Sequence, residues 1–434
     1  MARSIVVTVI CDGMRPDFVD DGLTPTLARL KREGTWFAAH RGIFPSVTRA
    51  SSASIGTGSH PISHGLRGNS IGLPGPDGLV FHDVGKPEYH AAHRAHFGRW
   101  LDRPSLAARA AGLGEAIHVS NASPGTAYFH DAEGHGHLFH RCLCHRPGRH
   151  DTGERLAAPA GWEGDRIAAA RFVTELLERR PPAATLWLSE PDKTMHAVPL
   201  GDPRHLAAMV LVDGLVGEVA RAVDLLREAG HDVLLMVGSD HGHEAVTEVI
   251  PVERRLYDAG FKRTLDGGDI LVAPQGSAAF VQFAPAAMDR IDEVVDWLGA
   301  QRWVAAVHHG EGLRRLGQAP AADMVMIEMA KSEGTNANGV PGLTAMAVRF
   351  SEAEEDVRRD CGMHGGRGPW ESRPTLIAHG NGFEAGAIST AATSIVDLAP
   401  TAAAHLGLGL DGFDGRPLQH GPMAIGRGEA ARSA

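Results

Sequence analysis

The sequence predicts an α/β fold in which a parallel sheet forms the core. Three mainly apolar segments, 4–11, 184–189 and 232–239, contain several β-branched residues. They lack the alternation of apolar and polar residues that is typical of a strand with one solvated face, so we expect strands buried on both faces. With 434 residues, of which 43% are hydrophobic and 22% charged, the chain is long enough for one large core of this kind.

Helix signals lie between the predicted strands. A Thr-Pro pair at 24–25 marks the start of a helix, and Gly34 marks its end. An Asp-Pro pair at 202–203 marks the start of a longer helix that we expect to end at Gly230. Its apolar residues recur at steps of three and four, which predicts one face packed on the sheet. These residues are Leu206, Met209, Val210, Val212, Leu215, Val216, Val219, Val223 and Leu226.

Side chains that can bind a metal ion follow each of the three predicted strands. Because ligand sites of open α/β sheets lie beyond the carboxyl ends of the strands, we expect these side chains to converge there. A further histidine lies in the segment Cys-Gly-Met-His-Gly. The candidates are Asp12 after the first strand, Asp192 and His196 after the second, Asp240 and His241 after the third, and His364.

One hydroxyl group is a candidate nucleophile. Thr48 ends the segment Phe-Pro-Ser-Val-Thr, and we expect a helix to begin just after it. A free threonine hydroxyl is a poor nucleophile, and it needs a base or a cation that lowers its pKa. The amide end of the helix would also offer backbone donors and a positive dipole to a bound phosphoryl group.

The sequence around these residues resembles the alkaline phosphatase superfamily, and within it the type I phosphodiesterase/nucleotide pyrophosphatase group. Each block alone is a weak signal, but the blocks follow the order of that group and span almost the whole chain. The phosphonoacetate hydrolases are close relatives that have the same threonine and the same set of metal ligands. The matching blocks are Cys11-Asp12-Gly-Met-Arg-Pro-Asp17, Phe44-Pro-Ser-Val-Thr48 with Gly68-Asn69, Glu190-Pro-Asp192-Lys-Thr-Met-His196, Ser239-Asp240-His241-Gly242, His364-Gly365, Arg373-Pro-Thr-Leu-Ile-Ala-His-Gly380 and Asp397-Leu-Ala-Pro-Thr401.

The resemblance implies an alkaline phosphatase-like three-layer α/β/α sandwich with a capping insertion, formed as a single catalytic domain over residues 1–434. Two regions interrupt the alternation of strand and helix patterns. Residues 70–160, rich in Gly, Pro, His and Arg, are interpreted as one insertion, and residues 266–360 as a second. We expect both to form a cap over the site, because such excursions from a rigid scaffold commonly determine substrate choice.

The resemblance also implies two divalent cations. The mixed oxygen and imidazole ligands suit Zn²⁺, with Mn²⁺ as the alternative. Two cations roughly 4 Å apart can stabilise the attacking and leaving oxygens of a displacement at phosphorus. In this assignment Thr48 attacks to form a phosphoryl-enzyme, and Asn69 donates to a phosphoryl oxygen. One cation would bind Asp192, His196 and His364, and the other Asp12, Asp240, His241 and the Thr48 oxygen.

Each of these residues alone has an ordinary structural explanation. An aspartate after a strand, such as Asp12 or Asp240, is commonly a helix N-cap, and so is a lone threonine. A single histidine such as His196 is more often buried and hydrogen-bonded than a ligand. These explanations do not account for an Asp-x-x-x-His pair, an Asp-His pair and a glycine-flanked histidine in this order.

The reaction that the resemblance implies is metal-dependent hydrolysis of a phosphodiester or nucleotide pyrophosphate-type ester. Phosphonate hydrolysis with cleavage of a C–P bond is the alternative. The phosphonoacetate hydrolases carry lysines in the cap, and the corresponding segment 119–127 has none, which argues against phosphonoacetate itself. A metal-binding protein without turnover would give no reason to retain Thr48 and Asn69.

The residue after the candidate nucleophile differs from the phosphodiesterase pattern. That group usually has an aromatic residue there, where Arg49 stands in this chain. An arginine could bind a phosphate or carboxylate group of the substrate through its planar set of donors. It could equally face solvent from the first turn of the helix, so both interpretations stay open.

The resemblance implies a small phosphorylated or phosphonate substrate, and the composition is compatible with it. The formal net charge is −10, and no run of Lys and Arg predicts binding to a nucleic acid polymer. No uncharged apolar segment approaches the length of about 18 residues that a membrane span needs. The four cysteines show no framework typical of secreted proteins, so we expect a cytoplasmic protein.

A cluster of histidines and cysteines lies between residues 130 and 150. A third metal site would use thiolate and imidazole ligands at such short spacing. A polar loop with incidental histidines is favoured, because the segment has Cys-x-Cys-His and no Cys-x-x-Cys pair. The cluster consists of His130, His135, His137, His140, Cys142, Cys144, His145 and His150.

Overall fold

The computed structural model describes residues 2–350, 358–419 and 425–426. In these ranges the largest sheet has eleven strands, and β1 lies near its middle between β10 and β11. β1 pairs in parallel with both, and Val7 lies opposite Ala184 and Leu235. The strands in spatial order are β23 (Ile425–Gly426), β21 (Ala387–Ser389), β2 (Thr35–Phe37), β20 (Leu376–His379), β11 (Asp232–Gly238), β1 (Ser4–Cys11), β10 (Ala183–Leu188), β6 (Ile117–Ser120), β7 (His137–Phe139), β8 (Cys144–Arg146) and β9 (His150–Asp151).

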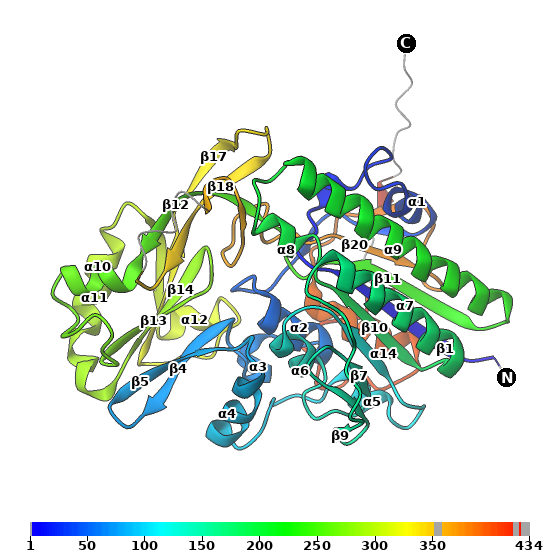
Figure 1. The fold of residues 1–434 in the computed structure, drawn as a ribbon, viewed down its shortest axis with the longest axis horizontal. Coiled ribbons are helices and arrows are strands. Elements are labelled where there is room, and N and C mark those ends of the chain that lie inside the picture. The colour runs from blue at the N-terminus through cyan, green and yellow to red at the C-terminus, as the bar shows by residue number, and fades with distance from the viewer. Residues whose placement is uncertain (1, 351–357, 420–424, 427–434) are drawn as a thin grey trace, which may run out of the picture.

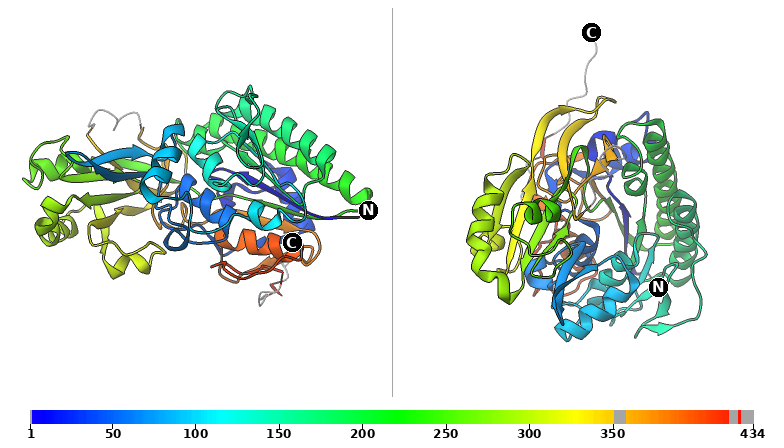
Figure 2. Two further views of the ribbon diagram at one scale, coloured as in Figure 1. Left: turned by 90° about the horizontal axis from the view of Figure 1, so that it is seen from below. Right: turned by 60° about the vertical axis from the view of Figure 1, so that its left-hand side comes forward.

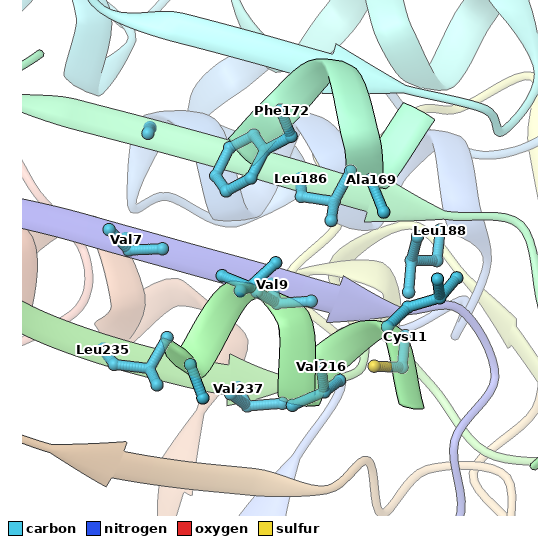
Figure 3. Packing of buried hydrophobic residues seen from close by; sticks show 14 of the residues in the cluster. Val7, Val9, Cys11, Ala169, Phe172, Leu186, Leu188, Val216, Leu235 and Val237 are labelled. Atoms are coloured by element: carbon cyan, nitrogen blue, oxygen red, sulfur yellow. The ribbon is translucent and has the colours of Figure 1, made fainter. Parts of the chain in front are cut away.

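Helices cover both faces of this sheet, which confirms the three-layer α/β/α sandwich (Figure 1). Val7, Val9 and Cys11 pack with the helices of one face, as Figure 3 shows. Val6 and Ile10 point to the other face. Since both faces are covered, each residue of β1 after Ser4 is buried, and a uniformly apolar strand is stable there. The first face holds α1 (Pro25–Glu33), α7 (Trp162–Arg179) and α9 (Pro203–Glu228), and the second holds α2 (Thr48–Thr57), α5 (Leu106–Ala110) and α14 (Leu398–His405).

The predicted helices are confirmed with small shifts at their ends. α1 begins at Pro25 and has Gly34 as its C-cap. α9 begins at Pro203, and the Asp202 side chain caps it by accepting from the Arg204 amide. The helix after the candidate nucleophile begins at Thr48 itself. The sheet is mixed, because β20 runs antiparallel to both β11 and β2.

A second group of strands lies beside the central sheet, at one end of the molecule (Figure 2). Its two sheets have four strands each, and Val272, Val281 and Ile327 belong to their shared core with α10 (Val252–Asp258) and α11 (Ile291–Gly299). One sheet consists of β17 (Lys331–Thr335), β18 (Pro341–Val348), β12 (Glu244–Pro251) and β19 (Gly362–Met363), and the other of β13 (Ile270–Pro274), β14 (Ala278–Phe283), β16 (Met324–Met329) and β15 (Val304–His309).

The segment 70–160 contributes to both parts of the molecule. The hairpin of β4 (Ser70–Gly75) and β5 (Gly78–Asp83) packs against β13, and the Gly72 amide donates to Gln282 Oε1 at 2.6 Å. Strands β6 to β9 of the same segment extend the central sheet. Further helices are α3 (Pro61–His64), α4 (Pro87–Phe97), α6 (Pro124–His130), α8 (Asp192–Met195) and α12 (Glu311–Arg314).

Within the described ranges, no helix combines the length and the apolar character that crossing a membrane requires. The four cysteines, all within these ranges, form no disulfide bond. The cytoplasmic location stays a prediction.

Candidate functional site

The candidate ligands meet at the carboxyl ends of the three central strands. Asp12 directly follows β1, Asp192 begins α8 shortly after β10, and Asp240 follows β11 by two residues. His364 directly follows β19, so the second group of strands brings it to the same place. Segments from distant parts of the sequence thus form one site, as their positions after parallel strands predict.

Asp12, Asp240 and His241 form the first ligand group, with ligand atoms within 4.8 Å of one another. His241 Nε2 lies 3.4 Å from Asp12 Oδ1 and 3.2 Å from Asp240 Oδ2. Thr48 Oγ1 lies 3.1 Å from the same nitrogen. The hydroxyl of the candidate nucleophile therefore borders this group.

Buried carboxylate oxygens in this group have no hydrogen-bond partner in the described part of the chain. Asp12 Oδ2 accepts from Trp187 Nε1 at 2.9 Å, but Asp12 Oδ1 and Asp240 Oδ2 have no partner. Burial, and then the charges of Asp240 and Asp192, raises the pKa of Asp12 well above its ordinary value. Two buried carboxylates that each have one oxygen without a hydrogen bond are costly unless a cation binds them, so the group fits a divalent metal.

Asp192 is the centre of a second ligand group that contains three histidines. Its Oδ1 lies 2.9 Å from His243 Nε2, 3.2 Å from His196 Nε2 and 3.6 Å from His364 Nε2. Burial alone would raise the pKa of Asp192, but the imidazoles of His196 and His243 hold it well below its ordinary value. A carboxylate and several imidazoles at these distances match the ligands that Zn²⁺ prefers.

Main-chain carbonyls orient three of the imidazoles. His196 Nδ1 lies 2.9 Å from the Gly362 oxygen, His364 Nδ1 2.7 Å from the Ser46 oxygen, and His241 Nδ1 3.1 Å from the Gly242 oxygen. A carbonyl only accepts, so the proton of each neutral ring is on Nδ1, and Nε2 keeps its lone pair for a cation. This second layer of hydrogen bonds supports a metal site.

His243 is a site residue that the sequence analysis missed. The available signal was the spacing Asp240-His-Gly-His243, but the resemblance assigns roles only to the first two of these residues. The His243 ring packs against Gly13, where an added Cβ would lie 2.6 Å from Nε2 and φ is +75°. Glycine adopts that backbone conformation without strain, so close contact of ring and backbone requires it there.

An ion-pair network holds the loop that carries His364. Glu371 accepts from the amides of Gly366 and Gly368, both at 3.0 Å, and it also contacts the Ser277 hydroxyl and Lys331 Nζ. Lys331 Nζ also lies 3.0 Å from Glu244. Burial alone would lower the pKa of Lys331, but the two carboxylates raise it. The ammonium group of Lys331 therefore stabilises the two buried carboxylates of Glu244 and Glu371 behind the site.

We predict that Lys331→Met will lower the free energy of unfolding by about 3 to 5 kcal/mol, because it leaves two buried carboxylates without a cation. Urea unfolding of the metal-loaded protein measures this. Arg29→Met is the control, since Arg29 and Glu33 are each 42% exposed and their pair should contribute less than about 1 kcal/mol. Similar losses in both variants would contradict the role of Lys331.

Thr48 and Asn69 lie together at the first turn of α2. Thr48 is the first residue of the helix, and its side chain is largely buried. Asn69 Oδ1 accepts from the Arg49 amide at 3.0 Å, so the Asn69 amide nitrogen remains available as a donor. Asn69 and His364 also line a common cavity of about 530 Å³.

A smaller cavity of about 230 Å³ lies on the other side of Arg49. Thr48, Asp12 and Asp192 line it, so it opens onto both ligand groups. Arg49 and His196 line both cavities. Arg49 therefore faces the site and not only the solvent, and its guanidinium Nε donates to Ser123 Oγ at 3.0 Å.

The structure does not assemble a third metal site from the histidines and cysteines between 130 and 150. Within the described ranges, the groups whose ligand atoms lie close enough for a metal are Asp12, Asp240 and His241, and Asp192, His241, His243 and His364, so His241 belongs to both and His196 to neither. His137 instead pairs with Glu115, and His140 Nε2 lies 3.1 Å from the Ala122 oxygen.

Comparisons with known proteins agree with this geometry. Residues 6–309 match the family model of type I phosphodiesterase / nucleotide pyrophosphatase. Human ectonucleotide pyrophosphatase/phosphodiesterase family member 1 is 28% identical over 240 residues, which cover 54% of this chain and 23% of that protein. The chain thus spans about a quarter of the length of this curated relative.

Solved structures of a murine relative have the same fold. Ectonucleotide pyrophosphatase / phosphodiesterase 5 superimposes with a TM-score of 0.67 at 19% identity, over 95% of this chain and 97% of that one. An inactive variant of the same murine protein, in complex with AMP, gives a TM-score of 0.68 at 18% identity with the same coverage. The family model, which covers well over half of the residues, shows that this chain belongs to the type I phosphodiesterase / nucleotide pyrophosphatase family.

Proposed function

We propose that this protein is a metal-dependent hydrolase of phosphodiesters or nucleotide pyrophosphate-type esters, and that Thr48 is its nucleophile. The observation that carries the proposal is the position of Thr48 Oγ1. It lies 3.1 Å from His241 Nε2, beside two buried carboxylates that each have an unpaired oxygen. Membership of the family supports the reaction class.

The two ligand groups fit two divalent cations, Zn²⁺ or Mn²⁺. Asp12, Asp240, His241 and Thr48 would hold one cation, and Asp192, His196 and His364 the other. When bound, the metals would lower the pKa of the Thr48 hydroxyl and stabilise negative charge on the phosphoryl oxygens.

The residues of the chain position the reacting groups. Thr48 is held at the amino end of α2, where the helix dipole favours a negatively charged phosphoryl group. The Asn69 side chain is fixed by the Arg49 amide, and its free amide nitrogen would donate to a phosphoryl oxygen. The Thr48 oxygen would displace the alcohol of one ester bond to form a phosphoryl-enzyme, and water would then cleave the Thr48–phosphorus ester, releasing the phosphorus acid and restoring the hydroxyl.

We also propose that parts of the two segments 70–160 and 266–360 cover the site as a cap. The cavity of about 530 Å³ supports this, because it has walls from both segments. Ser70 and Phe81 come from the hairpin β4–β5, and Gln275 and Met346 come from the second group of strands. All four line the same space as Asn69 and His364.

His243 is proposed to orient Asp192 toward the metal. We predict that His243→Ala will weaken Zn²⁺ binding at the Asp192 group by about ten- to a hundredfold, because Asp192 loses its closest imidazole contact. Titration with a competing chelator measures the affinity. His308→Ala is the control, since His308 pairs with Glu328 in the second group of strands. Unchanged affinity in His243→Ala would contradict the orienting role.

A direct test of the reaction class compares bis-p-nitrophenyl phosphate with p-nitrophenyl phosphate, with the metal content measured on the same sample. We expect turnover of the diester that is lost when the metals are removed and restored when Zn²⁺ is added. Failure to hydrolyse either ester with both metal positions loaded would contradict the proposal.

A further inference from the structure

The cavity of about 230 Å³ beside the nucleophile has an unusual concentration of cationic side chains. Thr48, Asp12 and Asp192 form its inner end. Three cationic residues also line it: Arg49 from α2, Arg141 from the segment after β7, and Lys193 from α8. Three cations thus face one small space that opens directly onto the reacting groups.

Neutral groups hold these three cations in place. Arg141 Nη1 donates to the Asn121 carbonyl at 2.7 Å and to Asn121 Oδ1 at 3.1 Å. Lys193 Nζ donates to the Ala160 carbonyl at 2.6 Å, and Arg49 Nε donates to Ser123 Oγ.

Among the residues that the structure describes, none of the three forms a direct ion pair with a carboxylate, and the carboxylates that line the cavity are those of the candidate metal ligands Asp12 and Asp192. Asp165 lies behind Asn121, but it accepts from Asn121 Nδ2 at 2.9 Å and from the amides of Ser189 and Glu190. The positive charge is therefore fixed in position and remains available to a ligand. Guanidinium groups in such positions bind carboxylate or phosphate oxygens through several N–H donors.

The size and lining of the cavity restrict what can occupy it. A volume of about 230 Å³ is below the range of roughly 300 to 1,000 Å³ that is usual for drug-sized ligands. The other side chains of the wall are small or polar, including Asn121, Ser123 and Thr126, and its one aromatic ring is the imidazole of the candidate metal ligand His196, with no Phe, Tyr or Trp. A nucleobase usually stacks on aromatic rings, so this space suits a small anionic group better than a base.

We propose that the substrate is a small phosphorus ester with a second anionic group, a carboxylate or a phosphate, which binds between Arg49, Arg141 and Lys193. This inference rests on the proposed function, because the cavity opens onto the same nucleophile. It narrows the substrate class from phosphodiesters in general to those with an anionic tail and without a nucleoside at this position.

The test compares three diesters that share the p-nitrophenyl leaving group, on the metal-loaded protein. Their second ester group is carboxymethyl, its neutral isostere carbamoylmethyl, or 5′-thymidyl. We expect kcat/KM for the carboxymethyl diester to exceed that of each of the other two by about tenfold or more.

Variants of the cavity test which residues produce this preference. Arg141→Gln, Lys193→Met and Arg49→Gln are each expected to lower the ratio of kcat/KM between the carboxymethyl and carbamoylmethyl diesters by about tenfold. Arg302→Gln, at a side chain that is 80% exposed in the second group of strands, should leave the ratio unchanged. The comparison of substrates on the unmodified protein does not depend on any variant folding.

The outcomes separate this inference from the proposed function. Hydrolysis of all three diesters at similar rates, with no preference for the carboxymethyl group, would overturn the anionic-tail proposal and leave the hydrolase proposal intact. A preference that persists in all three cavity variants would also overturn it. Absence of hydrolysis of every diester by the fully loaded protein would overturn the proposed function itself.

Discussion

Replacing Thr48 by alanine is expected to lower kcat by about a thousandfold or more, because it removes the attacking oxygen. The protein should fold normally, since the side chain fills little space at the first turn of α2. Metal content should change little, because Asp12, Asp240 and His241 remain as ligands of the adjacent cation. Steady-state kinetics with bis-p-nitrophenyl phosphate and metal analysis on the same sample measure both effects.

Thr48→Ser is the matched control for this variant. It keeps a hydroxyl group at the same position and should therefore retain far more activity than Thr48→Ala. Activity of Thr48→Ala within about threefold of the unmodified protein would contradict a nucleophilic role for this residue.

Removing a ligand from either group is expected to release one cation and to lower activity by about two orders of magnitude or more. Asp240→Asn should empty the group beside Thr48, because it removes one of the carboxylates with an unpaired oxygen. His364→Ala should empty the Asp192 group, because it removes an imidazole whose Nε2 is 3.6 Å from Asp192 Oδ1. Metal analysis after dialysis should give about two cations in the unmodified protein and about one in each variant.

His137→Ala is the control for these two variants. It also removes a histidine, but His137 is the first residue of β7 and pairs with Glu115. It should keep two cations. A stoichiometry of one in fully active, unmodified protein would contradict the assignment of two metals.

The sequence predicts the central strands of the sheet because their apolar residues are buried on both faces, as the pattern requires. The segments that became β1, β10 and β11 are apolar on both faces, and the structure covers both faces with helices. The convergence of Asp12, Asp192 and Asp240 was also predictable, because they follow β1, β10 and β11, whose carboxyl ends lie at the same edge of the sheet.

Other features depend on contacts between distant segments, which local patterns do not encode. The segment Leu376–His379 has the composition of a strand, but its antiparallel direction follows from its pairing with β11 and β2. The inward position of His243 depends on the backbone of Gly13, which is distant in the sequence.

The cationic cavity could not be inferred from the sequence for the same reason. The position of Arg49 directly after Thr48 indicates a possible contact with the substrate. Arg141 lies in the histidine-rich segment and Lys193 within the Asp-x-x-x-His motif, and neither position indicates such a contact. The fold alone brings these three side chains to one space. Within the described residues, the histidines and cysteines between 130 and 150 do not form a group of close ligand atoms, although they lie near one another in the sequence.

The stereochemical course at phosphorus tests the central claim most directly. The substrate is a p-nitrophenyl phosphorothioate diester of one configuration, hydrolysed by the metal-loaded protein in ¹⁸O-labelled water. Attack by Thr48 followed by attack of water comprises two in-line displacements, so we predict net retention of configuration. A single direct attack by water would give inversion, and inversion would contradict the proposed phosphoryl-enzyme at Thr48.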